Sequence, residues 1–515
     1  MTKSFNEYFK ETILKNKRLV VAAIIVTVLA FGFTITNFSI GVDDPAAYHY
    51  LHTNGSGNMI QQGRLSHVLF DKLTGGRLTF IPFLNDFVGA ALFGFSALVF
   101  CGLFQYVTDG KLNDVELISF AGIYISYSII SEKFIYNLDV IVTMLSYVCV
   151  AYSLALICEY FKFKKQGERG IKRLVLACFA EIIALGSYES FAVVYICGVF
   201  AIFVMECVAG DRKLSFKDVL LRGLMFLLVL VVALVVYYSA VRVVQILDGQ
   251  SNIQSKGAAF FSSSFEKDGG LFTRIKESVS QYIYSIDLTY LPVKEFIAFS
   301  GIGLILIAGY SVKRKSWLLP LCYLGLWASN FGIYFAVGTL MYRANQTYCL
   351  FAALVAVLIA FSFRKMKIKP VIISALAGLL IFVQLADLNL SFYNDYSRYK
   401  KEEYVIHTIA TRLVAECDVG KPVVFCVKGG GCGYLANPAG SHRVNGSTVI
   451  GWGCTAFYDD TTPMMIDLFR MHGYGFINQA TPEQAELGNK LAEDMECWPN
   501  KDCIKEFDDF IVVNF

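Results

Sequence analysis

Long apolar stretches alternate with short polar segments along most of this chain of 515 residues. A hydrocarbon core of about 30 Å is crossed by a helix of about 20 apolar residues. The runs that reach or approach this length lie near residues 19–38, 81–106, 116–131, 138–160, 173–187, 190–209, 220–247, 291–312, 317–339, 347–363 and 370–390. The pattern therefore predicts about eleven transmembrane helices, of which those at 116–131 and 173–187 are short.

The first apolar run follows a basic N-terminal segment, an arrangement that also occurs in signal peptides. This run is about 20 residues long, and no small-residue cleavage site follows it. We therefore interpret it as a retained first transmembrane helix.

Composition supports a polytopic membrane protein. Hydrophobic residues make up 56% of the chain, charged residues only 17%, and the mean hydropathy is +0.53. Soluble globular proteins contain about 25% charged residues. The formal net charge of +3 gives no reason to expect a nucleic-acid partner.

Basic residues gather in alternate loops of this predicted topology. The clusters are Lys15, Lys17 and Arg18; Lys162, Lys164, Lys165, Lys172 and Arg173; Arg212, Lys213, Lys217 and Arg222; Lys313, Arg314 and Lys315; and Arg364, Lys365, Lys367 and Lys369. Cytoplasmic loops carry an excess of Lys and Arg. The pattern predicts a multi-pass plasma-membrane protein with its N-terminus in the cytoplasm and its C-terminus outside.

After residue 391 the composition changes to that of a soluble domain. Residues 402–416 have helical apolar spacing, 421–427 and 509–515 are typical of buried strands, and 481–495 begins with a Thr cap and an acidic first turn. We predict a membrane domain at 1–390, with outer loops 39–80 and 248–290, and a small extracytoplasmic α/β domain at 391–515.

Six of the 14 cysteines lie in this tail: Cys417, Cys426, Cys432, Cys454, Cys497 and Cys503. An even number of cysteines in an exported domain favours disulfides, and Cys497 and Cys503 are the easiest local pair. Reduced thiols and a metal site are the alternatives. Zinc is disfavoured because the tail has no CxxC pair.

Two adjacent acids, Asp43 and Asp44, stand just beyond the first helix, on the predicted outer face. Pro45 follows them, so they could simply be solvated or cap a short helix. The same loop continues with Gln62 and Arg64. Arg64 could pair with the acids, or it could bind a phosphate through its two-pronged guanidinium.

Other predicted outer turns also carry polar side chains. These are Glu132, Lys133 and Asn137 in 131–139, Tyr188 and Glu189 in the turn near 188, and Arg343 in 342–347. An Arg in an outer turn is contrary to the charge bias, although its side chain could also snorkel to lipid headgroups. The 248–290 loop mixes basic and aromatic residues, which suits either a lipid phosphate or plain membrane anchoring.

With these features the chain resembles the bacterial integral-membrane glucosyltransferases that convert O-antigen serotype. The matching segments are "DD" at 43–44, "QGR" at 62–64, "YES" at 188–190, "YRANQ" at 342–346, "DVGKPVVF" at 418–425 and "FIVVNF" at 510–515. The resemblance covers nearly the whole chain, but the cysteine-rich tail departs from it. It implies a GT-C-like fold in the bacterial inner membrane, a catalytic acid in the first outer loop, a polyprenyl-phosphate sugar donor and a surface glycan acceptor. Glucose as the sugar rests on this resemblance alone.

Sugar transfer from a lipid phosphate needs a base for the acceptor hydroxyl and cations for the departing phosphate. We assign the base to Asp44, with Asp43 as its partner or alternative, and predict inversion at the anomeric carbon. The predicted phosphate ligands are Arg64, Arg343 and Lys133, and the predicted substrate-binding residues are Glu189, Glu132, Tyr188, Asn137 and Gln62. No cofactor or metal is required, although paired carboxylates could hold Mg or Mn.

Two other functions remain open at this point. A flippase for lipid-linked sugars would share the membrane fold, but the sequence contains no internal repeat of the kind common in transporters. A surface polysaccharide polymerase or ligase would share the lipid donor. The tail could bind the acceptor, act as a receptor or cap the helical bundle.

Overall fold

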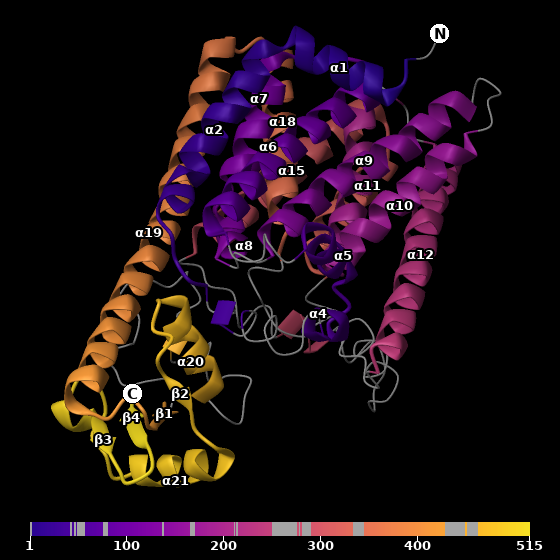
Figure 1. Cartoon of the computed structure of the whole chain (residues 1–515). Helices are drawn as coiled ribbons and strands as arrows, with labels where there is room; N and C mark the ends of the chain where they lie inside the picture. Colours follow the sequence, from indigo (N-terminus) through magenta and orange to yellow (C-terminus); the bar gives the residue numbers. More distant parts are fainter. Residues whose placement is uncertain are drawn as a thin grey trace.

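The computed structural model describes residues 3–41, 44–45, 48, 57–75, 81–135, 139–164, 170–210, 212, 215–249, 276–277, 279–280, 290–332, 345–427, 449–450 and 462–515. A bundle of long helices forms most of the molecule, and a small mixed sheet with two helices lies beyond one end of it (Figure 1). The predicted helical membrane fold with a small C-terminal α/β unit is therefore confirmed.

Each of the eleven predicted spans overlaps a helix. They are α2 (Lys17–Thr36), α6 (Pro82–Val107), α7 (Asp114–Ser126), α9 (Val140–Lys164), α10 (Ile171–Ser187), α11 (Phe191–Val208), α12 (Phe216–Leu247), α15 (Leu291–Arg314), α16 (Leu318–Ser329), α18 (Tyr348–Lys365) and α19 (Pro370–Glu416). Within the described ranges nine segments are long and apolar enough to span a membrane. The other two helices, α10 and α16, have 17 and 12 residues.

Burial separates the helices into central and peripheral ones. α7, α9, α11 and α18 are mostly buried, whereas α12 and α19 expose many leucines and valines. Helices that are hydrophobic on every side are stable in lipid, because they satisfy their backbone hydrogen bonds internally. The exposed apolar surface of α12 and α19 is therefore lipid-facing surface.

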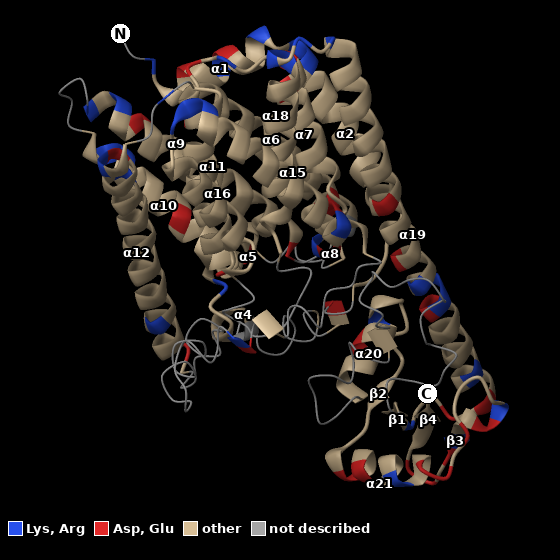
Figure 2. Cartoon of the chain, turned by 180° about the vertical axis from the view of Figure 1, so that it is seen from behind, with Lys and Arg blue, Asp and Glu red and all other residues tan. Residues whose placement is uncertain are grey.

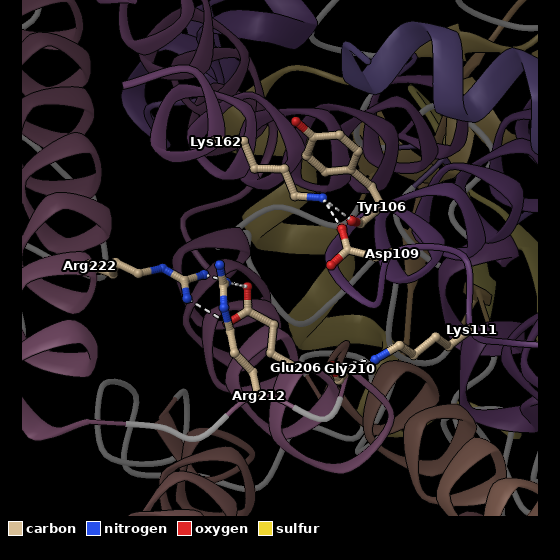
Figure 3. A network of polar contacts seen from close by, with 8 residues as sticks. All are labelled: Tyr106, Asp109, Lys111, Lys162, Glu206, Gly210, Arg212 and Arg222. Atoms are coloured by element: carbon tan, nitrogen blue, oxygen red, sulfur yellow. Dashed lines mark hydrogen bonds and ion pairs between the residues drawn. The ribbon is translucent and has the colours of Figure 1, made fainter. Parts of the chain in front are cut away.

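The basic clusters gather at the end of the bundle that carries the N-terminus (Figure 2). Here the amphipathic helix α1 (Phe5–Lys15) begins with a capping box between Ser4 and Glu7. Several of the cations in these clusters pair with acidic side chains near helix ends, as Figure 3 shows. Glu206 accepts from Arg222 at 2.8 Å and from Arg212 at 3.2 Å, and Lys162 donates to Asp109 at 2.7 Å.

Short elements lie at the opposite end of the bundle: α4 (Gly57–Gln61), α5 (Leu65–Thr74), η1 (Ser128–Ile130) and α8 (Ser131–Phe134). Beyond them, the 47-residue helix α19 continues through residue 390, the predicted domain boundary, and ends in the tail (Figure 1). At 1.5 Å per residue it is about 70 Å long, more than twice the hydrocarbon thickness. The predicted helix at 402–416 is its last segment.

The tail sheet has the order β2-β1-β4-β3, formed by β1 (Pro422–Cys426), β2 (Asn478–Gln479), β3 (Ile504–Glu506) and β4 (Ile511–Asn514). β1 pairs in parallel with β2 and β4, and β3 is antiparallel to β4. One face of the sheet packs on α19 and α20 (Thr462–Met471), and the other on α21 (Pro482–Ala492). α21 begins with the predicted cap, Thr481, which accepts a hydrogen bond from the backbone of Gln484.

The predicted disulfide between Cys497 and Cys503 is wrong, because both are free thiols. Cys503 is fully buried in the tail core, where Arg412 Nη1 donates to its Sγ at 3.5 Å, while Cys497 is only half-buried. Burial also raises the pKa of the Cys503 thiol. Cys417 is also a free thiol, and Cys432 and Cys454 lie outside the described residues.

Candidate functional site

The polar residues that the sequence singled out lie at the end of the bundle nearer the tail. Among the described residues these are Asp44, Gln62, Arg64, Glu132, Lys133, Tyr188 and Glu189. Asp43, Asn137 and Arg343 fall outside the described residues, so their predicted roles stay predictions. Asn345 and Gln346, from the turn that contains Arg343, are buried.

Tyr188 lies at the centre of a cluster with two cations. Its backbone is extended where α10 ends. Lys133 Nζ lies 4.1 Å from the centroid of its ring, and Arg64 Cζ lies 5.1 Å from it. Cations at such distances are attracted by the negative face of the ring. Two cations from distant parts of the sequence are thereby held together at one aromatic side chain.

An acid outside the predicted set of site residues, Asp139, holds Arg64. Asp139 forms an ion pair with Arg64 Nη1, and His67 Nδ1 lies 3.6 Å from the other Asp139 oxygen. Burial lowers the pKa of His67 to about 4, so its imidazole is neutral at neutral pH. Asp139 is the last residue of the polar segment 131–139, six positions after Lys133. Its place in that segment is the sequence feature that could have indicated its role at the site.

Two polar side chains on α12 support the segment before Arg64. Tyr237 donates to the carbonyl of Gly63 at 3.0 Å, and Glu189 Oε1 lies 3.4 Å from the same hydroxyl oxygen. Gln245 donates to the carbonyl of Ile60 at 3.1 Å. Gly63 has a φ of +74°, and a Cβ there would lie 2.7 Å from the Tyr237 hydroxyl. A side chain at this position is therefore excluded both by backbone conformation and by contact.

Glu132 and Lys133 project from a short irregular segment between α7 and α9. Ser128 in η1 donates to Asp387 of α19 at 2.6 Å, which ties this segment to the long helix. Tyr290 donates to Glu132 Oε1 at 3.4 Å. Glu132 and Lys133 are 4% and 7% exposed, so both charged groups are held inside the protein.

Asp44 is 1% exposed, and its Oδ2 accepts a hydrogen bond from the backbone N–H of Gly41 at 2.6 Å. Gly41 packs directly on the segment that carries Lys133, since an added Cβ would lie 2.0 Å from the carbonyl oxygen of Ile135. The candidate base and a candidate phosphate ligand therefore lie on segments in direct contact.

A further acid, Asp86 near the start of α6, interacts electrostatically with Asp44. Its Oδ2 accepts a hydrogen bond from Thr34 at 3.0 Å. Asp86 does not stand out in the sequence because it lies inside an apolar run. Within the described ranges, no group of three or more His, Cys, Asp or Glu side chains could hold a metal ion. Since Asp43 lies outside those ranges, the expectation of metal-independent chemistry stays a prediction.

Comparison with known proteins gives a family. The model of the family Glucosyl transferase GtrII matches residues 32–339, more than half of the chain. This match contains Asp44, Arg64, Lys133, Asp139 and Tyr188, whereas Asn345, Gln346 and Asp387 lie beyond it. Searches among curated proteins and among solved structures found no match. The chain therefore belongs to the Glucosyl transferase GtrII family.

Proposed function

We propose that this protein transfers glucose from a polyprenyl-phosphate donor to a surface glycan, such as O-antigen, outside the bacterial plasma membrane. Family membership supports glucose as the sugar. The observation that carries the proposal is the pair of cations, Arg64 and Lys133, at the Tyr188 ring, beside the segment of Asp44.

The charge distribution supports the orientation. The helix ends that carry Lys and Arg clusters gather at the N-terminal end of the bundle, and the tail lies beyond the other end (Figure 2). By the positive-inside rule the basic end is cytoplasmic. The candidate site and the tail then face the extracytoplasmic side, where the surface glycan is available.

The two cations suit a lipid phosphate. A polyprenyl-phosphate sugar is a phosphodiester that gains negative charge on its phosphate as the bond to the sugar breaks. Arg64 and Lys133 would stabilise that charge in a site that is already organised before the reaction. Asp139 holds Arg64 at the Tyr188 ring, so the guanidinium needs little reorganisation when the donor binds.

Asp44 is our proposed base. The acceptor hydroxyl oxygen forms a bond to the anomeric carbon while the bond from that carbon to the phosphate oxygen breaks. The hydroxyl proton passes to the Asp44 carboxylate, and the bonding electrons leave with the phosphate. This single displacement inverts the anomeric centre, and the products are the extended glycan and polyprenyl phosphate.

Single substitutions of the two acids test the assignment. With a synthetic polyprenyl-phosphate glucose, D44N should lower the transfer rate by 10²- to 10⁴-fold, the usual contribution of a general base. Donor binding should persist, and D43N should have the smaller effect. Asp218 is an exposed acid at the basic end of α12, so D218N is the matched control and should transfer normally.

Two outcomes would overturn the proposal. Full transfer by both D44N and D43N would remove the base assignment, and donor translocation without transfer by the native protein would indicate a flippase. Orientation has its own test, because a membrane-impermeant maleimide should label Cys497 on intact spheroplasts. Labelling that requires permeabilised membranes would reverse the topology.

A further inference from the structure

The segment that connects α2 to Asp44 packs into the tail domain. Ile40 is 1% exposed and belongs to the same buried cluster as Ile406 of α19, Phe425 of β1 and Val513 of β4. These residues lie more than 350 positions further along the chain. The tail core thus contains a residue that stands four positions before the proposed base.

A buried arginine of α19 binds the same segment. Arg398 is 2% exposed and forms ion pairs with Asp395 at 2.8 Å and Glu402 at 2.5 Å. Its Nη2 also donates to the carbonyl of Ile40 at 2.7 Å. Ser39 donates to Asp395 Oδ2 at 2.5 Å, so the ion-pair cluster contacts two consecutive residues of the segment.

One peptide group joins this arginine to Asp44. The carbonyl of the Ile40–Gly41 peptide accepts from Arg398, and the N–H of the same peptide donates to Asp44 Oδ2 at 2.6 Å. A peptide group is planar and rigid, so fixing its oxygen also fixes its N–H. A cation at the oxygen also polarises the group and strengthens its N–H as a donor.

We infer that Arg398 is a positioning residue for the transfer reaction, acting on Asp44 through the Ile40–Gly41 peptide. The inference rests on the proposed role of Asp44 as the base. By this inference the tail domain contributes to catalysis. The guanidinium, its two carboxylate partners and the residues that bury Ile40 all belong to α19 and the tail.

The electrostatic surroundings of Asp44 set the direction of the pH effect. Among the described residues, the charged groups on the elements around its segment include Asp86 of α6, Glu132 and Lys133 of α8, and Asp395, Arg398 and Glu402 of α19. The Gly41 N–H favours the ionised carboxylate that a base requires. A weaker or displaced N–H should therefore raise the pKa of Asp44 and move the acidic limb of the kcat profile to higher pH.

The test uses R398K in the full-length protein. Lysine keeps the charge but lacks the planar fork that reaches Asp395, Glu402 and Ile40 together. Because a misplacement of about 1 Å can cost about 10²-fold in rate, we expect kcat to fall about 100-fold. KM for the donor should change by less than about 3-fold, since the fork contacts neither cation of the Tyr188 cluster.

R412K is the matched control. Arg412 also lies on α19, pairs with an acid four residues later and donates to the backbone carbonyl of Lys501. Its hydrogen bonds and ion pairs within the described residues go to the tail and not to residues 37–41. Its kcat and pH profile should equal those of the wild type. Should R398K fail to fold, S39A loosens the same cluster while keeping all three of its charged side chains, and it should lower kcat about 5-fold.

A double variant separates failure of this inference from failure of the proposed function. If Arg398 acts through Asp44, D44N/R398K should lose no more activity than D44N. Wild-type kcat and pH profile in R398K, or wild-type kcat in S39A, would overturn the inference even with D44N inactive. An active D44N would instead overturn the assignment of the base.

Discussion

Gly41 offers the sharpest test of how closely the Asp44 segment must pack. A methyl group at this position would lie 2.0 Å from the carbonyl oxygen of Ile135, whereas ordinary contacts begin at 3.4 Å. The obstacle is backbone, so no side chain can rotate away. The segment around Gly41 must move by more than about 1 Å. Asp44 must move with it because its carboxylate accepts a hydrogen bond from the Gly41 N–H.

Displacements of that size typically lower catalytic rates by about 10²-fold, so G41A should reduce kcat about 100-fold. The assay is glucosyl transfer from synthetic polyprenyl-phosphate glucose by purified protein, with thermal unfolding followed in parallel. Gly32 provides the control, since a Cβ there would meet nothing within 4 Å on α2. G32A should transfer normally and gain about 0.5–1 kcal/mol of helix stability. Transfer by G41A at more than a third of the wild-type rate would refute the reasoning.

Three further predictions follow from the site and the tail. Replacing Tyr188 by Leu removes a ring whose attraction for two cations contributes about 2 kcal/mol, so Y188L should raise KM for the donor about 30-fold. Y188F keeps an aromatic ring and should change KM less than 3-fold, and equal KM values in the two variants would contradict the role of the ring. Because the pKa of His67 falls to about 4 on folding, the free energy of unfolding should decrease by up to about 3 kcal/mol as pH falls from 6.5 towards 4. H67Q should show a weaker pH dependence of the free energy of unfolding, and the same dependence in both proteins would contradict the low pKa of His67. In non-reducing mass spectrometry, Cys497 should react with maleimide in the native protein and Cys503 only after unfolding; a disulfide would prevent both reactions.

The positions of the helices were predictable because the bilayer makes a simple demand on the sequence. A spanning helix needs an apolar run of a certain length, and each of the eleven runs overlaps a helix. Two of the four tail strands, β1 and β4, and the Thr481 cap were also readable from local patterns, whereas β2 and β3 were not predicted. The disulfide prediction failed because sequence proximity does not say which thiol points into the core.

The candidate site was predictable only in part. Polar residues at helix ends indicated which segments to consider, including those of Asp44, Arg64 and Lys133. Their partners were not readable from local patterns. Tyr237 and Asp86 lie inside apolar runs, and the sequence of such a run does not show which residues a polar side chain contacts.

By itself the sequence determined which stretches form long apolar helices, the basic end of the bundle and the polar turns between helices. These features depend on local hydrophobicity and charge, which act over one helix at a time. Only the tertiary structure decided that Arg64 and Lys133 share the Tyr188 ring, and that Arg398 contacts the peptide next to Asp44. Such contacts join residues dozens to hundreds of positions apart, and their geometry follows from the packing of the whole chain.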